Sequence, residues 1–70
     1  MSVKRVFADI NRCKEKERKR RILNILNGDA EIQDISHSGN GLFIFFSSVA
    51  YSGDGVVYID GDYWSISKSE

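Results

Sequence analysis

The sequence has no proline, one cysteine and one histidine among its 70 residues. The single cysteine, Cys13, excludes an internal disulfide bond and a zinc site built on cysteines, and it favours a reducing, cytoplasmic setting. No apolar run approaches the roughly 20 residues that a membrane-spanning helix needs, and no secretory signal pattern is visible. We therefore expect a cytoplasmic protein with no membrane partner.

Side chains suited to catalysis are few and scattered along the sequence. Cys13 lies on an apolar helical stripe and His37 lies in a Ser/Gly-rich turn, so a Cys–His pair has no third residue to orient it. Asp54, Asp60 and Asp62 lie in glycine turns, where aspartate is favoured for backbone reasons, and they lack the spacing of a calcium loop. The sequence therefore favours a protein that is not an enzyme and that uses no metal or cofactor.

The composition is that of a folded domain, with 41% hydrophobic and 29% charged residues. Residues 1–70 suffice for a single small domain. A domain of this size buries only about 60% of the surface of its unfolded chain, so its stability is marginal. We expect a partner chain to supply the missing stability.

The charges are separated along the sequence, although the net charge is zero. Residues 1–21 contain nine basic and three acidic residues, a net charge of +6, and residues 22–70 contain one basic and seven acidic residues, a net charge of −6. Such a split is typical of a basic arm for an acidic partner, or of two halves that complement each other. The basic residues that would lie on one side of an N-terminal helix, spaced to follow a phosphate backbone, are Arg5, Arg12, Lys16, Lys19 and Arg20.

Apolar residues at helical spacing predict a helix over residues 3–13. Residues 14–21 are polar, and their Glu-to-Lys and Glu-to-Arg pairs four residues apart favour continuation of the helix in solvent. Residues 21–26 hold a second apolar patch, which points well over a quarter-turn away from the first. Two interpretations stay open: a helix that ends at Gly28, or a strand over residues 21–26 that turns into a second strand over residues 30–36.

The second half of the sequence predicts β-strands separated by glycine turns. One apolar run begins at Leu42 and extends towards Tyr51, and two shorter strands flank Gly61 as a hairpin. Across these turns we expect Val57 to lie opposite Ala50 and opposite Ile66. The predicted fold is α+β, with an N-terminal helix packed on an antiparallel meander sheet of about four strands. The alternative is a small five-stranded barrel with residues 21–26 as its first strand.

The strand residues separate into two faces, and both are apolar. The face expected to form the core collects Leu42, Ile44, Phe46, Ala50, Val57, Ile59, Trp64 and Ile66. The second face collects Phe43, Phe45, Val49, Tyr51, Tyr58 and Tyr63. One helix covers only one face, and burying each phenylalanine is worth about 1.5–3 kcal/mol. We therefore expect a partner on the second face, unless the sheet curls into a barrel or residues 14–27 cover that face.

Residues 34–39 read Asp-Ile-Ser-His-Ser-Gly, which places Asp34, Ser36 and Gly39 in the pattern D-x-S-x-x-G. In this pattern, and in the arginine cluster before it, the chain resembles the PilZ domains, which bind cyclic di-GMP. The resemblance covers about residues 18–46 and implies that these three residues bind a cyclic dinucleotide. The arginine pair of that family has the spacing R-x-x-x-R, which the arginines of this chain do not match.

These observations together predict a non-enzymatic protein that acts by docking onto another protein or onto a second copy of itself. Inhibitors, adaptors and accessory proteins of phages or mobile elements are of this kind, an association that is statistical rather than physical. The aromatic second face would be the binding surface. The two alternatives are nucleic-acid binding through the basic helix and PilZ-like binding of a cyclic dinucleotide.

Overall fold

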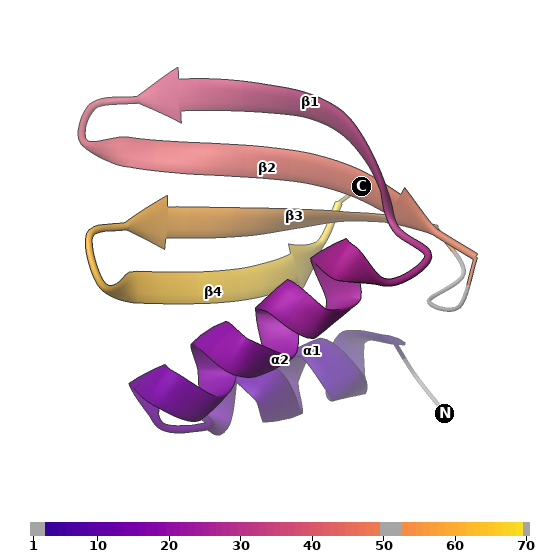
Figure 1. Cartoon of the computed structure of the whole chain (residues 1–70), viewed down its shortest axis with the longest axis horizontal. Helices are drawn as coiled ribbons and strands as arrows, with labels where there is room; N and C mark the ends of the chain where they lie inside the picture. Colours follow the sequence, from indigo (N-terminus) through magenta and orange to yellow (C-terminus); the bar gives the residue numbers. More distant parts are fainter. Residues whose placement is uncertain (1–2, 50–52, 70) are drawn as a thin grey trace.

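The computed structural model describes residues 3–49 and 53–69, with side chains from residue 5 onward. Two helices, α1 (Val3–Arg12) and α2 (Glu15–Asn27), precede four strands: β1 (Glu31–Ser38), β2 (Gly41–Ser48), β3 (Gly53–Asp60) and β4 (Tyr63–Lys68). The strands form an open antiparallel meander in the order β1-β2-β3-β4, with both helices beside β4 (Figure 1). The predicted α+β fold, an N-terminal helical segment packed on an antiparallel meander of about four strands, is confirmed, although the helical segment consists of two helices and not one.

The predicted single helix is interrupted at residues 13–14, and this break solves a geometric conflict. On one straight helix, the apolar residues of the first turns and those near the end would point in different directions. With the break, Phe7 and Ile10 of α1 and Ile22 and Ile25 of α2 all reach one core. Each of these four side chains is buried.

Residues 21–26 therefore belong to a helix, and the interpretation that makes them a strand is wrong. The five-stranded barrel is wrong with it, because the sheet has four strands and stays open. As a helix, α2 packs its apolar patch against β4 and α1, in the same core as Phe7 and Ile10.

The core lies between the helices and one face of the sheet. Its sheet side is formed by Phe46, Val57 and Ile66, one from each of β2, β3 and β4, and all three are buried. Phe7 of α1 meets Phe46 edge-to-face, with 6.4 Å between the ring centroids. The face predicted to be covered by a helix is therefore the face that the helices cover.

The β3–β4 hairpin has the predicted register, with Ile59 opposite Trp64 and Val57 opposite Ile66. The predicted β2–β3 register is wrong, because Val57 lies opposite Ile44 and not opposite Ala50, which is outside the described residues. Asp54 and the glycines on either side of it, which the sequence predicted to form a turn, are part of β3, which begins at Gly53. The displacement is six residues, an even number, so the paired residues keep the faces predicted for them.

A close approach explains why a glycine of this segment belongs in a strand. Gly55 lies opposite Phe46, and a Cβ at Gly55 would come within 2.5 Å of the Phe46 ring. The glycine leaves the space that this buried ring occupies. Its role is to accommodate a core side chain and not to form a turn.

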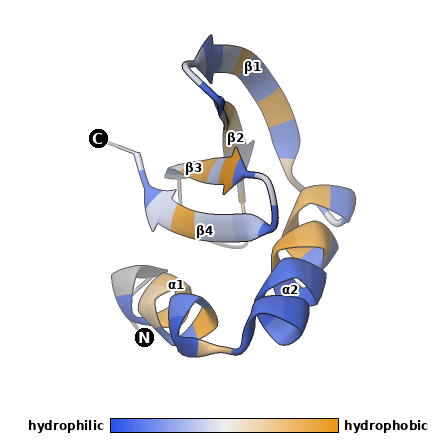
Figure 2. Cartoon of the chain, turned by 90° about the vertical axis from the view of Figure 1, so that its left-hand side faces the viewer, coloured by the Kyte–Doolittle hydropathy of each residue, from blue (hydrophilic) through white to orange (hydrophobic). Residues whose placement is uncertain are grey.

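The two edges of the sheet differ. On β4, the side-chain amide of Asn11 donates to the Ile66 carbonyl at 2.7 Å and accepts from the Ile66 N–H at 2.9 Å, as a neighbouring strand would. On β1, every residue is exposed, including Ile32 and Ile35 at about half of their surface. Figure 2 shows β1 at the end of the sheet away from α1.

Candidate docking surface

The helices leave one face of the sheet uncovered, and we call it the open face. Its centre consists of two neighbouring cross-strand pairs of β2 and β3, Phe43 with Tyr58 and Phe45 with Val56. These four side chains are half-buried by one another, and Tyr63 at the β4 end is 54% exposed. The result is a continuous apolar surface that the helices leave uncovered, apart from the Arg18 guanidinium at Tyr63.

The rings of the open face form a row across three strands. The ring centroids of Phe43 and Tyr58 are 4.8 Å apart, and those of Tyr58 and Tyr63 are 6.2 Å apart. At the end of the row, the guanidinium carbon of Arg18 lies 5.4 Å from the Tyr63 ring centroid. A Cβ on Gly41 would come within 2.5 Å of Cε1 of the Tyr58 ring. The absence of a side chain at Gly41 therefore lets this ring lie against the sheet.

Carboxylates surround this aromatic centre. The register places Glu31 and Asp34 of β1 on the open face, because they lie opposite Ser47 and Phe45. Asp54 and Asp60, near the two ends of β3, are on the same face, and all four acidic side chains are exposed. Among the described strand residues, this face carries no lysine or arginine, so its rim is acidic.

Tyr58 connects the aromatic centre to the acidic rim. Its hydroxyl donates to an Asp60 carboxylate oxygen at 3.4 Å. Desolvation by its neighbours and then the negative charge of Asp60 raise the pKa of Tyr58 above its ordinary value, because both disfavour a phenolate. The hydroxyl is therefore held as a neutral donor.

The structure brings most of the predicted docking residues together. Phe43, Phe45, Tyr58 and Tyr63 share the open face, as expected from the alternation of side chains along each strand. Val49 does not join them: it follows the end of β2 and is 90% exposed. The prediction had extended this strand too far.

Tyr51, the remaining predicted member, lies outside the described residues. Val56 belongs to the open face and was missed, although it precedes Tyr58 by two residues and the alternation alone would have placed it there. The acidic rim was also missed, because the aspartates at the ends of β3 were interpreted only as turn residues.

The predicted basic stripe does not form, because the helix that would carry it is broken. Arg5 and Arg12 are on α1, whereas Lys16, Lys19 and Arg20 are on α2. Several of these charges have partners within the protein: Arg12 lies 3.9 Å from Asp9, Lys19 stands over the Trp64 ring and Arg20 pairs with Glu17. Hydrogen bonds from Arg20 and Arg21 lower the pKa of the Glu17 carboxyl.

The residues that carry the resemblance to PilZ domains lie together at the β1–β2 hairpin. Asp34 and Ser36 project from the open face of β1, opposite Phe45 and Phe43. Gly39 is in the turn with a φ of 59°, a left-handed conformation that favours glycine. The arginines of α2 lie on the other side of the sheet, apart from the Arg18 guanidinium at Tyr63.

Cys13 and His37 are in different parts of the fold. Cys13 is half-buried between the two helices, and its thiol donates to the Asp9 carbonyl at 3.5 Å. His37 is exposed on β1, in a strand and not in the predicted turn. Among the described residues, no three histidine, cysteine, aspartate or glutamate side chains gather in a way that could hold a metal ion.

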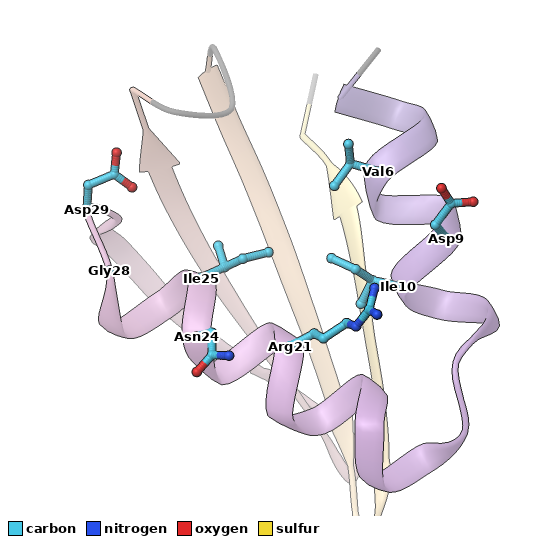
Figure 3. Close-up of a pocket in the computed structure, with 8 residues that line it drawn as sticks. All are labelled: Val6, Asp9, Ile10, Arg21, Asn24, Ile25, Gly28 and Asp29. Carbon is cyan, nitrogen blue, oxygen red and sulfur yellow. The ribbon is translucent and has the colours of Figure 1, made fainter. Parts of the chain in front are cut away.

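A hollow lies between the two helices and has a volume of about 450 Å³. Figure 3 shows Ile10 and Ile25 facing each other across it, with Arg21 reaching from α2 towards α1. Two of its polar side chains have partners in the protein, since Arg21 donates to Glu17 at 2.9 Å and Asp29 accepts from Ser48 at 2.9 Å. The surface of the hollow is mainly apolar.

Comparison of the chain with known protein families, curated proteins and solved structures gave no match. In the part of the chain that the structure describes, neither helix has the length and the apolar character to cross a membrane. The choice of a candidate functional surface therefore depends on the geometry of the structure. On that basis, we take the open face, with its aromatic centre and acidic rim, as the candidate.

Proposed function

We propose that this chain is a non-enzymatic binding protein of the cytoplasm that docks through its open face onto another protein or onto a second copy of itself. The single observation that carries this proposal is the continuous apolar surface of Phe43, Phe45, Val56, Tyr58 and Tyr63 on the side of the sheet away from the helices. Exposed apolar patches rimmed by polar residues mark interaction sites in proteins of this size. An inhibitor or adaptor that acts by occupying its partner needs no further chemistry.

Two physical arguments support a protein as the ligand. Covering the remaining apolar area of this face contributes about 25 cal/mol for each Å² removed from water. Tyrosine and phenylalanine are also enriched in the centres of protein interfaces, where a tyrosine hydroxyl tolerates partial exposure. The unpaired Cys13 favours the reducing setting in which such a protein would act.

The structure gives less support to nucleic acid as the ligand of the open face. Aromatic side chains on a sheet can stack on bases, but such sheets combine stacking with positive charge along the backbone path. Here the rim residues Glu31, Asp34, Asp54 and Asp60 are acidic and would repel phosphate groups. Nucleic-acid binding through the helices and cyclic dinucleotide binding at Asp34, Ser36 and Gly39 stay as separate predictions.

Site-specific photo-crosslinking tests the proposal. A benzophenone amino acid at Tyr63 or at Ser65 would report what covers the open face, and the same group at the exposed Ala8 of α1 is the matched control. After irradiation in cells that produce the protein, we expect protein adducts at Tyr63 and Ser65, and few at Ala8. The adduct masses then identify the partner.

The proposal fails if the two open-face positions give no protein adduct while Ala8 does. It also fails if the adducts at Tyr63 and Ser65 are nucleic acid, because the face would then be a stacking platform. Circular dichroism of each variant shows beforehand that the fold is retained, so that a negative result refers to the surface and not to unfolding.

A further inference from the structure

We infer that the occupant of the open face is the basic solvent-facing side of α2 from a second copy of this chain. The contact would be head-to-tail, from the helix layer of one copy to the sheet layer of the next. This inference rests on the proposed function, because it names the partner of the same open face. The observation behind it is the distribution of charge and exposed apolar surface over the two layers.

The fold converts the charge separation of the sequence into a separation in space. The segment that holds the helices, residues 3–27, contains nine basic and three acidic residues, and the segment from the first to the last strand, residues 31–68, contains one basic and five acidic residues. The ion pairs Arg12–Asp9, Arg20–Glu17 and Arg21–Glu17 each lie within one helix. They leave the acidic rim of the open face available to positive charge from another molecule.

The solvent-facing side of α2 has the complementary chemistry. Lys16, Arg20 and Leu23 follow one another at spacings of four and three residues, so they share one side of the helix. All three are exposed, Leu23 at 39%, whereas Ile22 and Ile25 on the opposite side are buried. Their surface is hollowed, and the side chains around the hollow are Lys14, Lys16, Glu17, Lys19, Arg20 and Leu23.

The dimensions of the two surfaces agree. A helix of 13 residues such as α2 is about 20 Å long, and strands of eight residues such as β2 and β3 are about 26 Å long. A helix of that length laid on the open face would set Leu23 against the rings and its lysines against the rim. A stable interface buries about 800 Å² on each partner, a sixth of the 4738 Å² that this chain exposes. One helix on one sheet face is at the small end of that range, so we expect weak association.

The two surfaces lie on opposite sides of one molecule, and this determines the symmetry. A two-fold axis pairs a surface with itself, whereas two different surfaces on opposite sides give a heterologous contact. Heterologous contacts continue from copy to copy until they close as a ring or form an open chain. The inference therefore predicts association beyond a dimer, which sets it apart from edge-to-edge pairing through β1.

Two variants that each disable one surface test the inference in the full chain. The helix variant carries Lys14→Glu and Lys16→Glu, near the start of α2, where acidic side chains favour the helix dipole. The sheet variant carries Asp34→Lys and Asp54→Lys, at exposed positions of the rim. A control with the same charge change as the helix variant carries Arg5→Glu and Arg12→Glu on α1.

Sedimentation velocity at increasing protein concentration is the measurement. For the unaltered chain in low salt, we expect the average mass to rise above that of a dimer as the concentration increases. At 0.5 M salt we expect the association constant to be at least tenfold lower, because the surface charges are then screened. Each variant alone is expected to stay a monomer, whereas the α1 control associates as the unaltered chain does. An equimolar mixture of the two variants is expected to form one-to-one dimers and nothing larger, since each copy retains one active surface.

Three results would overturn the inference: a monomer at every concentration, assembly that stops at a dimer in the unaltered chain, or a mixture that stays monomeric. None of them would remove the proposed function, provided that photo-crosslinks at Tyr63 still reach a different protein. Conversely, the absence of any adduct on the open face would remove the proposed function as well.

Discussion

Replacing Gly55 by alanine is the sharpest test of how the core is built. A methyl group at this position would lie 2.5 Å from Cζ and 2.8 Å from Cε1 of the Phe46 ring. Carbon atoms in contact are about 3.5–4.0 Å apart, so roughly 1 Å of overlap must be relieved. Phe46 is fully buried and meets Phe7 on its other side, so the ring cannot move into solvent.

The expected loss follows from two opposing effects. Overpacking a core typically costs about 1–3 kcal/mol, whereas alanine in place of glycine inside a strand stabilises by roughly 0.5–1 kcal/mol. The net loss for Gly55→Ala is then about 1–2 kcal/mol. In a domain of this length each kcal/mol lowers the melting temperature by about 4–8 °C. The measurement is urea and thermal unfolding followed by the fluorescence of Trp64.

Gly41→Ala is the matched control. Its Cβ would also lie 2.5 Å from a ring, but that ring belongs to Tyr58, which is half-buried on the open face and can turn outward. We expect a clearly smaller loss of stability for Gly41→Ala than for Gly55→Ala. Combining Gly55→Ala with Phe46→Leu should cost less than the sum of the two single changes, because the smaller side chain makes room. A Gly55→Ala protein as stable as the parent would refute the packing described for Phe46.

The other predictions concern the core, the tyrosine and the helices. Ile22→Ala should lower the free energy of unfolding by about 2–5 kcal/mol, measured in urea, because this side chain is fully buried. Asp60→Asn should lower the raised pKa of Tyr58, measured by ultraviolet titration. Because the folded state favours the neutral phenol, the contribution of Tyr58 to the free energy of unfolding is present below pH 10 and is lost as the pH rises through the raised pKa. If the helices bind nucleic acid, the affinity should fall steeply with salt and be lost in Lys16→Glu with Lys19→Glu; an unchanged affinity would contradict that function.

The sequence predicted those features of the fold that local signals specify. The Gly61 hairpin and the two faces of the sheet follow from turn chemistry and from a period of two, and both are confirmed for the paired strands. The β2–β3 register was missed because Gly53 and Gly55 were interpreted as turn formers. Gly55 instead accommodates the Phe46 ring across the hairpin, a contact between residues nine apart that no local pattern contains.

The break between the helices illustrates a second kind of limit. The conflict between the two apolar patches was visible in the sequence, but no proline or glycine marks where the chain bends. Arg18 donates to the Cys13 carbonyl at 2.9 Å and so binds a backbone oxygen at the end of the first helix. The break also lets the apolar residues of both helices reach the same core, so its position is favoured by tertiary packing. The aromatic members of the open face were predicted correctly because alternation along a strand does not depend on such contacts.

The amide of Asn11 has a consequence for how strands from other molecules can add to this sheet. The amide occupies the outward-facing N–H and carbonyl of Ile66, so these two groups cannot pair with an added strand. Among the described strands, β1 is then the edge more open to backbone pairing. Two copies that pair through their β1 edges would form a closed pair, whereas a sheet with two free edges could continue to add strands.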